Sequence, residues 1–522
     1  MKNFILTLSV FAALPVWGQI QLDNQFEDWS AIPHSTSTDG GPFVAAAVTS
    51  NADWLYLHIE VEQEVALDEN ALPNDYRILL DLDDDPVTGV DYASQGLGVD
   101  LLINLATRQA IRYTNGSGIE SFNEIGMRAA PTYSGNEFEL AFDRELTQVV
   151  GDGVRVKWYD NADQVGFPEA GLQHTLLDAP DSFVPVSIDR PPGTLNRVAF
   201  WNVNNRMDEL FAQQAMKRIL QAVDPDILAL SEVSNVSAAY VTGLLNDWLP
   251  LEGNATWNVV KDDWDLMVAS KGAILSSFPS VMRQFPALVE GHPGWGVPLL
   301  ITSSHLKCCG GSSNEAQRQA EADEYMAFLR DAMNGEGELA LAPNSPVVYG
   351  GDLNMVGLDD PIYTLVSGDI SDETTYGPDF NPDWDGTALT EQPLLQTDHG
   401  FDFTWMSGNI NSEWMPGKLD YLITSDASVE LMVGFVVRTE EMSEERLSEL
   451  GLEADDALDA SDHFLVVGDL GLGDLLGSAP DTDEDGVNDY EDNCAYAENP
   501  GQADFNGDGI GDACSDADGD GL

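Results

Sequence analysis

The sequence predicts a multidomain protein: an antiparallel β-sandwich, then a layered α/β region, then an irregular acidic repeat. The chain has 522 residues, more than the about 250 to 300 at which a single core usually stops growing. Runs of alternating apolar and polar residues fill its first part, whereas strands alternate with amphipathic helical runs in the middle. Aspartate and glycine recur at a short period in the tail. The predicted divisions are 1–18 for a cleaved leader, 19–188 for the sandwich, 189–194 for a linker, 195–470 for the α/β domain, 471–480 for a second linker and 481–522 for the repeat.

The first residues have the pattern of a secretory signal peptide. Lys2 precedes the apolar run 4–16, and the small residue Gly18 follows as a cleavage site. The run is shorter than the about 20 apolar residues that a membrane-spanning helix needs, and no later segment approaches that length. We therefore expect a secreted, extracellular protein, free or associated with the cell surface, with no stable membrane insertion.

The first domain is predicted from alternating runs such as 54–59 and 154–158, which Gly, Asn and Asp separate. Its acidic segment 80–89, together with 26–29, resembles the family 9 type of carbohydrate-binding β-sandwich, and this resemblance implies a glycan as a partner. The aspartates of the run 81–85 form either a calcium loop or a solvated turn.

Aromatic residues of the first domain have two interpretations. They would stack on a sugar in a glycan-binding module, but most tryptophans of a small sandwich serve its core. We expect the core for each of the four candidates, which are Trp29, Trp54, Tyr76 and Trp158.

The charge of the chain restricts its partners. Ninety acidic residues against 22 basic ones give a formal net charge of -68. Acidic residues at this excess repel one another unless salt or bound cations screen their charges. The same excess also excludes tight binding of nucleic acid through a basic groove, because Lys and Arg supply that attraction. A polyanionic substrate must therefore be met through metal ions.

The middle region places polar residues at the ends of apolar, strand-like runs. A strand at 198–201, a helical run at 209–222 and a buried strand at 227–230 indicate layered α/β architecture. Functional side chains converge at strand ends in such sheets. Singly, each of these residues is equally typical of a helix cap, a turn or a packed core, but their combination in this order is far more specific. The set comprises Asn202, Glu232, His305, Asp352, Asn354, Asp420, Asp462 and His463.

This ordered set resembles the endonuclease/exonuclease/phosphatase superfamily, which includes secreted nucleases of the DNase I type, abasic-site endonucleases, bacterial sphingomyelinases and inositol-phosphate phosphatases. The resemblance covers about 195–470 and implies a DNase I-like α/β sandwich of four layers. The resemblance implies that Asn202 and Glu232 bind Mg²⁺ (or Mn²⁺), with Asp462 as a further ligand. It implies that Asp352 and Asn354 orient the attacking water and contact the phosphate. His463, held by Asp420, would be the acid-base catalyst, and His305 would contact the phosphate.

The chemistry of a phosphodiester makes independent sense of these residue types. In-line attack needs a hard cation on the non-bridging oxygens, and Mg²⁺ prefers one or two carboxylates, such as Glu232, with further oxygen ligands. Activation of water needs a group that titrates near neutral pH, and the pairing of His463 with Asp420 suits that task. The acidic partner of His305 is not evident in the sequence, although Asp265 is a candidate.

Four cysteines fall in two pairs, adjacent Cys308 and Cys309, and Cys494 with Cys514 in the tail. We expect both pairs to be oxidised in an exported protein. A disulfide between Cys308 and Cys309 would stiffen the loop that follows His305. Zinc ligation is the alternative, but the spacings lack the paired C-x-x-C pattern.

The tail alternates acidic residues before turning glycines, which suits Ca²⁺ because this ion takes oxygen ligands. It resembles the thrombospondin type 3 repeat over 481–522. A disordered acidic tail is the alternative. The predicted structural calcium ligands are Asp481, Asp483, Asp485, Asp504, Asn506, Asp508, Asp516, Asp518 and Asp520.

The leading functional hypothesis is an extracellular nuclease that cleaves DNA or RNA with a divalent metal. A phospholipid or sphingomyelin phosphodiesterase of the same fold is the main rival. A third hypothesis, outside the enzymes, is a non-catalytic, calcium-stabilised surface protein that binds glycans. The joint presence of the eight polar residues at strand ends argues against that last hypothesis.

Overall fold

The computed structural model describes residues 20–38, 40–67, 75–114, 118–279 and 281–473, and in the tail 475, 493–494, 497, 499–503, 511 and 513–514. The predicted signal peptide therefore lies outside the described residues. So do all nine predicted calcium ligands of the tail, from Asp481 to Asp520.

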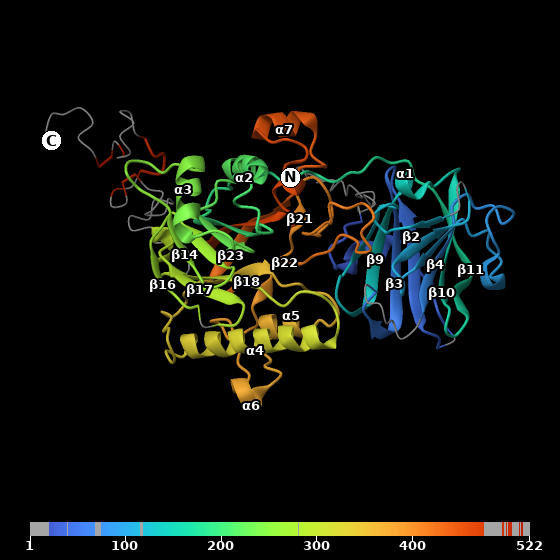
Figure 1. Ribbon diagram of the computed structural model, residues 1–522, viewed down its shortest axis with the longest axis horizontal. Helices are drawn as coiled ribbons and strands as arrows, with labels where there is room; N and C mark the ends of the chain where they lie inside the picture. The colour runs from blue at the N-terminus through green and yellow to red at the C-terminus, as the bar shows by residue number, and fades with distance from the viewer. Residues whose placement is uncertain are drawn as a thin grey trace, which may run out of the picture.

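The N-terminal domain is an antiparallel β-sandwich, as predicted, and lies at the right of Figure 1. One sheet runs in the order β1 (Ser35–Thr36), β2 (Phe43–Ser50), β3 (Trp54–Val65), β9 (Gly135–Asp143) and β8 (Met127–Ala130). The other runs in the order β11 (Val165–Thr175), β10 (Gly153–Asp160), β4 (Tyr76–Asp81), β5 (Leu101–Asn104), β6 (Gln109–Arg112) and β7 (Gly118–Glu120). Short helical turns accompany the strands at η1 (Phe26–Ala31), η2 (Tyr92–Ser94) and α1 (Arg144–Thr147).

The aromatic residues of the sandwich serve its cores. Trp29, Tyr76 and Trp158 are each 1% exposed, and Trp54 is 7% exposed. The edge of the Trp54 ring packs on Phe401 of the next domain, with ring centroids 4.9 Å apart. The expectation that these aromatics are core residues is confirmed, and none of the four is available to stack on a sugar.

The central domain has two mixed sheets packed face to face. The first sheet runs in the order β14 (Asn258–Lys261), β15 (Met267–Ser270), β13 (Ile227–Ser231), β12 (Asn196–Asn202), β24 (Leu465–Leu472), β23 (Val429–Val437) and β21 (Leu395–Gln396). The second runs in the order β16 (Ile274–Ser277), β17 (Gln284–Val289), β18 (Leu299–His305), β19 (Val347–Asp352), β22 (Asp420–Thr424) and β20 (Thr390–Glu391). Their facing sides share one apolar cluster, to which Phe200, Ile301 and Val348 belong.

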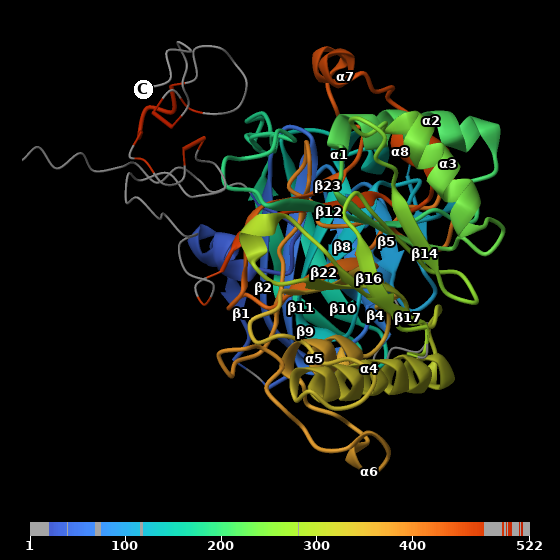
Figure 2. The same ribbon diagram turned by 90° about the vertical axis from the view of Figure 1, so that its left-hand side faces the viewer.

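Helices cover the two outer faces and complete the predicted four layers, as Figures 1 and 2 show. The first sheet packs on α2 (Leu210–Val223), α3 (Ala238–Trp248), α7 (Glu444–Leu450) and α8 (Asp456–Ala460). The second packs on α4 (Ser312–Met333) and α5 (Asp360–Ser367), with α6 (Glu373–Tyr376) and η3 (Pro293–Trp295) in the connections. No helix in the described part of the chain is both long and apolar enough to cross a bilayer.

A buried ion pair joins the two central strands of the first sheet. Arg197 on β12 lies opposite Asp469 on β24. Its guanidinium donates to both carboxylate oxygens, at 2.8 and 2.7 Å, and also to the carbonyl of Val223 at 2.7 Å. The two side chains are 2% and 0% exposed. The pair thus fixes the register of two strands that lead into the polar strand ends.

Replacement of Asp469 by Ala should be strongly destabilising, because it leaves the guanidinium of Arg197 buried and uncompensated. We expect the free energy of unfolding to fall by about 3–5 kcal/mol, measured by urea denaturation of the full chain. Asp247→Ala is the matched control, because Asp247 pairs with Lys217 at the surface, where the side chains are 73% and 38% exposed. Its effect should stay below about 1 kcal/mol. Equal losses in the two variants would contradict the assignment.

Candidate active site

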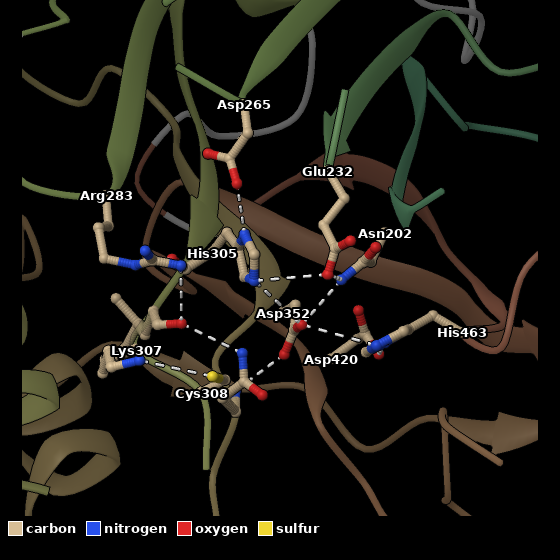
Figure 3. Close-up of polar contacts among 12 residues, drawn as sticks. Asn202, Glu232, Asp265, Arg283, His305, Lys307, Cys308, Asp352, Asp420 and His463 are labelled. Atoms are coloured by element: carbon tan, nitrogen blue, oxygen red, sulfur yellow. Dashed lines mark hydrogen bonds and ion pairs between the residues drawn. The ribbon is translucent and has the colours of Figure 1, made fainter. Parts of the chain in front are cut away.

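The predicted polar residues meet at one edge of the two facing sheets. Strands β12 and β13 are parallel and β24 is antiparallel to them, while β18 and β19 are parallel and β22 is antiparallel. The carboxyl ends of four strands therefore lie beside the amino ends of β22 and β24. Strand pairing also sets a row across the second sheet, in which His305 lies opposite Asp352 and Asp352 lies opposite Asp420. Figure 3 shows the resulting cluster.

Asp352 occupies the centre of this cluster. It is 1% exposed, and its Oδ2 accepts a hydrogen bond of 2.9 Å from the amide nitrogen of Asn202 on the opposite sheet. The Nε2 atoms of His463 and His305 lie 3.6 and 3.7 Å from the same oxygen. Burial raises the pKa of Asp352, and the charges of the two histidines oppose that rise. A carboxylate thus stands between two imidazoles (Figure 3).

His463 is held as the sequence predicted. Its Nδ1 lies 2.7 Å from Oδ2 of Asp420, and this oxygen also accepts a hydrogen bond of 2.7 Å from the Thr404 hydroxyl. The indole of Trp201 donates to the His463 carbonyl at 2.9 Å. Burial acts to lower the pKa of His463, but the charges of Asp420 and Asp352 outweigh it and raise the pKa to about 10. The pKa thus lies above the near-neutral range expected from the sequence, because two carboxylates rather than one face the ring. Because Nδ1 is committed to Asp420, Nε2 is the atom that faces the pocket.

His305 has a carboxylate partner, which the sequence left open. Its Nδ1 lies 2.8 Å from Oδ2 of Asp265, a residue just before β15 on the other sheet. Burial acts to lower the pKa of His305, but the hydrogen bond that its ring donates to Asp265 and the charge of Asp352 raise it. The candidate Asp265 is therefore the partner in the structure.

Glu232 faces the same centre from the first sheet. It lies one residue beyond β13 with a φ of 53°, a left-handed conformation that is costly for a residue other than glycine and concentrates at functional sites. Its two carboxylate oxygens accept hydrogen bonds from Asn202 at 3.1 Å and Asn205 at 3.0 Å. Nε2 of His305 lies 3.8 Å from the nearer oxygen. The side chain is 29% exposed, so it reaches the solvent side of the pocket.

Asn202 joins the carboxylates of the two sheets. Its amide nitrogen donates to Glu232 and Asp352, and its amide oxygen accepts a hydrogen bond of 2.9 Å from the backbone of Asn204. Here, therefore, the residue positions two acidic groups. Its role as a direct metal ligand stays a prediction.

The remaining predicted residues lie around this centre. Asn204 donates to one oxygen of Asp462 at 2.9 Å, and Trp405 donates to the other at 3.2 Å. Asn354 donates through its backbone to Asp352 at 2.9 Å and through its amide to the carbonyl of Leu306 at 3.1 Å. All eight predicted site residues thus belong to one connected region of the structure.

The donor set of this region fits a small, hard cation. Carboxylate oxygens are ligands that Mg²⁺ prefers, and Glu232 and Asp462 supply them at the pocket. The amide oxygen of Asn202 accepts from the backbone of Asn204 in this structure. Asp352, Asp420 and His463 also place one ligand atom each within 4.8 Å of one another. Nδ1 of His463 is engaged by Asp420, however, so this trio is better described as an acid-base dyad beside a carboxylate.

The pocket at this site has walls that the sequence did not reveal. Its floor is formed by the polar residues, and none of the described residues that line it is Lys or Arg. One side is apolar and comprises Val356, Trp405, Trp414, Met415 and Leu419. A further wall residue, Thr132, comes from the N-terminal sandwich.

The sandwich also anchors the segment 405–417, which carries most of the apolar wall. Met415 is 4% exposed and packs in the core of the sandwich. The guanidinium of Arg108 stacks over the ring of Trp414, 3.4 Å from its centroid, and Asn123 donates to the Trp414 carbonyl at 2.8 Å. Thr132 donates to the carbonyls of Met355 and Lys418, each at 3.1 Å. The first domain therefore builds part of the pocket.

The predicted disulfide between Cys308 and Cys309 is absent. The two sulfurs are 2.8 Å apart, beyond the about 2.05 Å of a disulfide bond, and both cysteines are free thiols beside the pocket. The loop is held instead by Arg318 of α4, whose guanidinium donates to the carbonyls of Lys307 at 2.9 Å and Cys309 at 2.8 Å. No covalent link is needed where a buried guanidinium fixes both carbonyls. The predicted disulfide between Cys494 and Cys514 is confirmed.

Several solved structures resemble part of the chain. TDP2 from Caenorhabditis elegans is 18% identical, with 52% of this chain and 73% of that chain covered and a TM-score of 0.34. A beta toxin mutant from Staphylococcus aureus with bound magnesium ions is 15% identical, with 53% and 99% covered and a TM-score of 0.34. ANGEL2, a 2′,3′-cyclic phosphatase, is 13% identical, with 53% and 94% covered and a TM-score of 0.33. No curated protein matches the chain.

Two family models match the sequence. The thrombospondin type 3 repeat matches residues 471–502, in agreement with the predicted nature of the tail. The model of the endonuclease/exonuclease/phosphatase family matches residues 199–463, just over half of the chain. These limits enclose the residues that meet around Asp352, from Asn202 to His463. By this match, and with the four-layer sandwich that the resemblance implied, the chain belongs to the endonuclease/exonuclease/phosphatase family.

Proposed function

We propose that this chain is an exported phosphodiester hydrolase that uses a divalent metal and cleaves DNA or RNA. One observation carries the proposal. Asp352 lies between two histidines, and Nδ1 of each histidine is hydrogen-bonded to a further carboxylate. Such an arrangement holds a water molecule and a phosphate between groups that accept and donate protons. The predicted signal peptide and the thrombospondin type 3 repeat support an extracellular location.

The metal site of the proposal consists of Glu232, Asn202 and Asp462. Mg²⁺ or Mn²⁺, when bound there, supplies positive charge to the non-bridging oxygens of the phosphate. Glu232 suits this position because its side chain is partly exposed. Asn202 donates to both Glu232 and Asp352, so that the carboxylate that would hold the metal and the carboxylate that would orient the water belong to one hydrogen-bonded network.

The protein's own residues supply the proton transfers in this mechanism. Asp352 accepts a hydrogen bond from the attacking water and orients its oxygen toward phosphorus, in line with the leaving group. The Asp352 carboxylate takes the proton of this water as its oxygen bonds to phosphorus. Nε2 of His463 donates a proton to the leaving oxygen as the bond between that oxygen and phosphorus breaks, and Asp420 keeps the ring in one tautomer through Nδ1. Nε2 of His305 donates to a second phosphate oxygen, and Asp265 fixes its ring in the same way. Preorganised donors of this kind stabilise the transition state without a basic groove.

A lipid phosphodiester, such as sphingomyelin, is the second candidate substrate. The apolar wall and the lack of Lys or Arg among the described lining residues favour it. The same wall also suits nucleic acid, because bases stack on aromatic side chains such as Trp405 and Trp414. A non-catalytic glycan-binding role is disfavoured, since the four candidate aromatics are buried.

One substrate panel separates these candidates. The purified chain is assayed with Mg²⁺ on duplex DNA, single-stranded DNA, RNA and sphingomyelin vesicles. We expect hydrolysis of at least one nucleic acid at a rate above that on the vesicles. If only the sphingomyelin vesicles are hydrolysed, the substrate is a lipid and not a nucleic acid. If none of the four substrates is hydrolysed, the proposed activity is wrong.

Replacement of His463 by Ala should lower kcat/KM by about 100-fold to 10,000-fold, because positioned proton transfer contributes that much. Hydrolysis is followed with the preferred substrate, and circular dichroism checks the fold. His292→Ala is the control, because His292 caps η3 in the same domain outside the pocket. A His463→Ala variant with wild-type kcat/KM would remove His463 from the mechanism.

Replacement of Glu232 by Gln should weaken metal binding, because it removes the charge of a partly exposed carboxylate of the proposed site. We expect the Mg²⁺ concentration for half-maximal activity to rise by at least about tenfold. The measurement is a Mg²⁺ titration of the initial rate after removal of metal with a chelator. Glu209→Gln serves as the control, since Glu209 is exposed and pairs only with Arg206 among the described residues. An unchanged Mg²⁺ requirement in Glu232→Gln would refute the ligand role.

A further inference from the structure

A second cluster of carboxylates lies in the N-terminal sandwich, far along the chain from the catalytic residues. It consists of Asp81, Asp83 and Asp100, which place one oxygen each within 4.8 Å of one another. Asp81 is the last residue of β4, and Asp100 immediately precedes β5. Pairing of Leu80 with Leu101 brings these ends together. The loop between them closes through two backbone hydrogen bonds between Val90 and Val99, of 3.0 and 2.8 Å.

Two carboxylates of this cluster are buried, and no ion pair balances any of the three among the described residues. Asp81 is 1% exposed and Asp100 is 4% exposed. The nearby bases are engaged elsewhere: Arg155 pairs with Asp84 at 2.9 Å, and Arg112 pairs with Glu120 at 2.8 Å. Unpaired buried carboxylates are costly unless they coordinate a metal.

One oxygen of the cluster has no hydrogen-bond partner. Oδ1 of Asp81 accepts from the backbone of Asp85 at 3.1 Å, but Oδ2 is buried and unsatisfied. In contrast, Oδ2 of Asp100 accepts from Leu82 at 2.9 Å, and Oδ1 of Asp83 accepts from the Thr88 hydroxyl at 2.9 Å. Burial and the charges of Asp100 and Asp83 raise the pKa of Asp81 to about 7. A buried oxygen without a donor, among three acids, is a position that a bound cation would satisfy.

We propose that Asp81, Asp83 and Asp100 bind one Ca²⁺ ion, a structural site in the sandwich that is separate from the acidic repeat and from the catalytic pocket. Burial of the site favours Ca²⁺ over Mg²⁺. Mg²⁺ usually keeps several waters and is seldom enclosed by protein ligands alone, whereas Ca²⁺ takes six to eight oxygen ligands from carboxylates, backbone carbonyls and waters. The ion would bridge the end of β4 to the start of β5.

Hydrogen exchange of the full chain tests the site, because it localises the effect of calcium away from the tail. Peptides that cover 76–114 are compared in a chelator and in Ca²⁺ at about ten times its dissociation constant. We expect Ca²⁺ to slow their exchange by about tenfold. The Asp81→Asn variant should lose this protection, yet it should exchange no faster than the wild type in chelator, because it removes one buried charge. Peptides of the tail should respond to Ca²⁺ equally in both proteins.

Two further variants keep the test decisive. Asp84→Asn is the matched control, since Asp84 lies in the same loop but pairs with Arg155, and it should retain the protection by Ca²⁺. Asp83→Asn replaces Asp81→Asn if the latter fails to fold, because Asp83 is only half-buried. Absence of protection in the wild type, or its persistence in Asp81→Asn and Asp83→Asn, would overturn the site. Equal protection by Mg²⁺ would overturn its assignment to calcium.

Discussion

The hydrogen bond from Asn202 to Asp352 joins the two sheets of the central domain at the point where their polar ends meet. Asn202 ends a strand of the first sheet, and Asp352 ends a strand of the second. The same amide holds Glu232, so one side chain sets the spacing between two acidic groups that would otherwise repel each other. The positions of both histidines follow, because each faces Asp352 through Nε2 and is fixed by a carboxylate at Nδ1.

The strongly acidic composition is accommodated in different ways in different parts of the molecule. In the core, Asp469 is neutralised by Arg197. At the active site, the acids are matched by imidazoles, which supply donors while leaving the pocket without Lys or Arg among its described lining residues. Under the proposed function, an anionic substrate would be attracted to this site by a bound cation rather than by a positive surface field. Such binding loses less affinity at high salt than binding through a basic groove.

The sequence predicted the parts of this structure that depend on local pattern. Alternation of apolar residues predicted the β-sandwich, and strands followed by helical runs predicted the layered α/β domain, whose four-layer arrangement was implied by the family resemblance. Strand ends predicted residues such as Asn202 and Asp352, because side-chain periodicity is a property of one segment. Contacts between distant segments were harder. Asp265 lies 40 residues from His305 in sequence, and only the packing of one sheet on the other brings them together. Asn205, which supports Glu232, follows a predicted residue closely but gave no signal, since asparagine in a turn is common.

The error at Cys308 and Cys309 has a similar origin. Adjacent cysteines in an exported chain suggest oxidation, but the loop conformation is set by Arg318, which approaches from a helix. The apolar wall was also missed, because the segment 405–417 has no regular secondary structure and its place depends on another domain.

The anchoring of that wall limits how the molecule can be rearranged during evolution. Met415 is packed inside the sandwich, and Trp414 is clamped beneath Arg108. A recombination event that exchanged the N-terminal sandwich for an unrelated domain would remove the residues on which these side chains pack. It would therefore change the shape of the pocket. The two domains must therefore be inherited as a unit, with changes in one selected together with changes in the other.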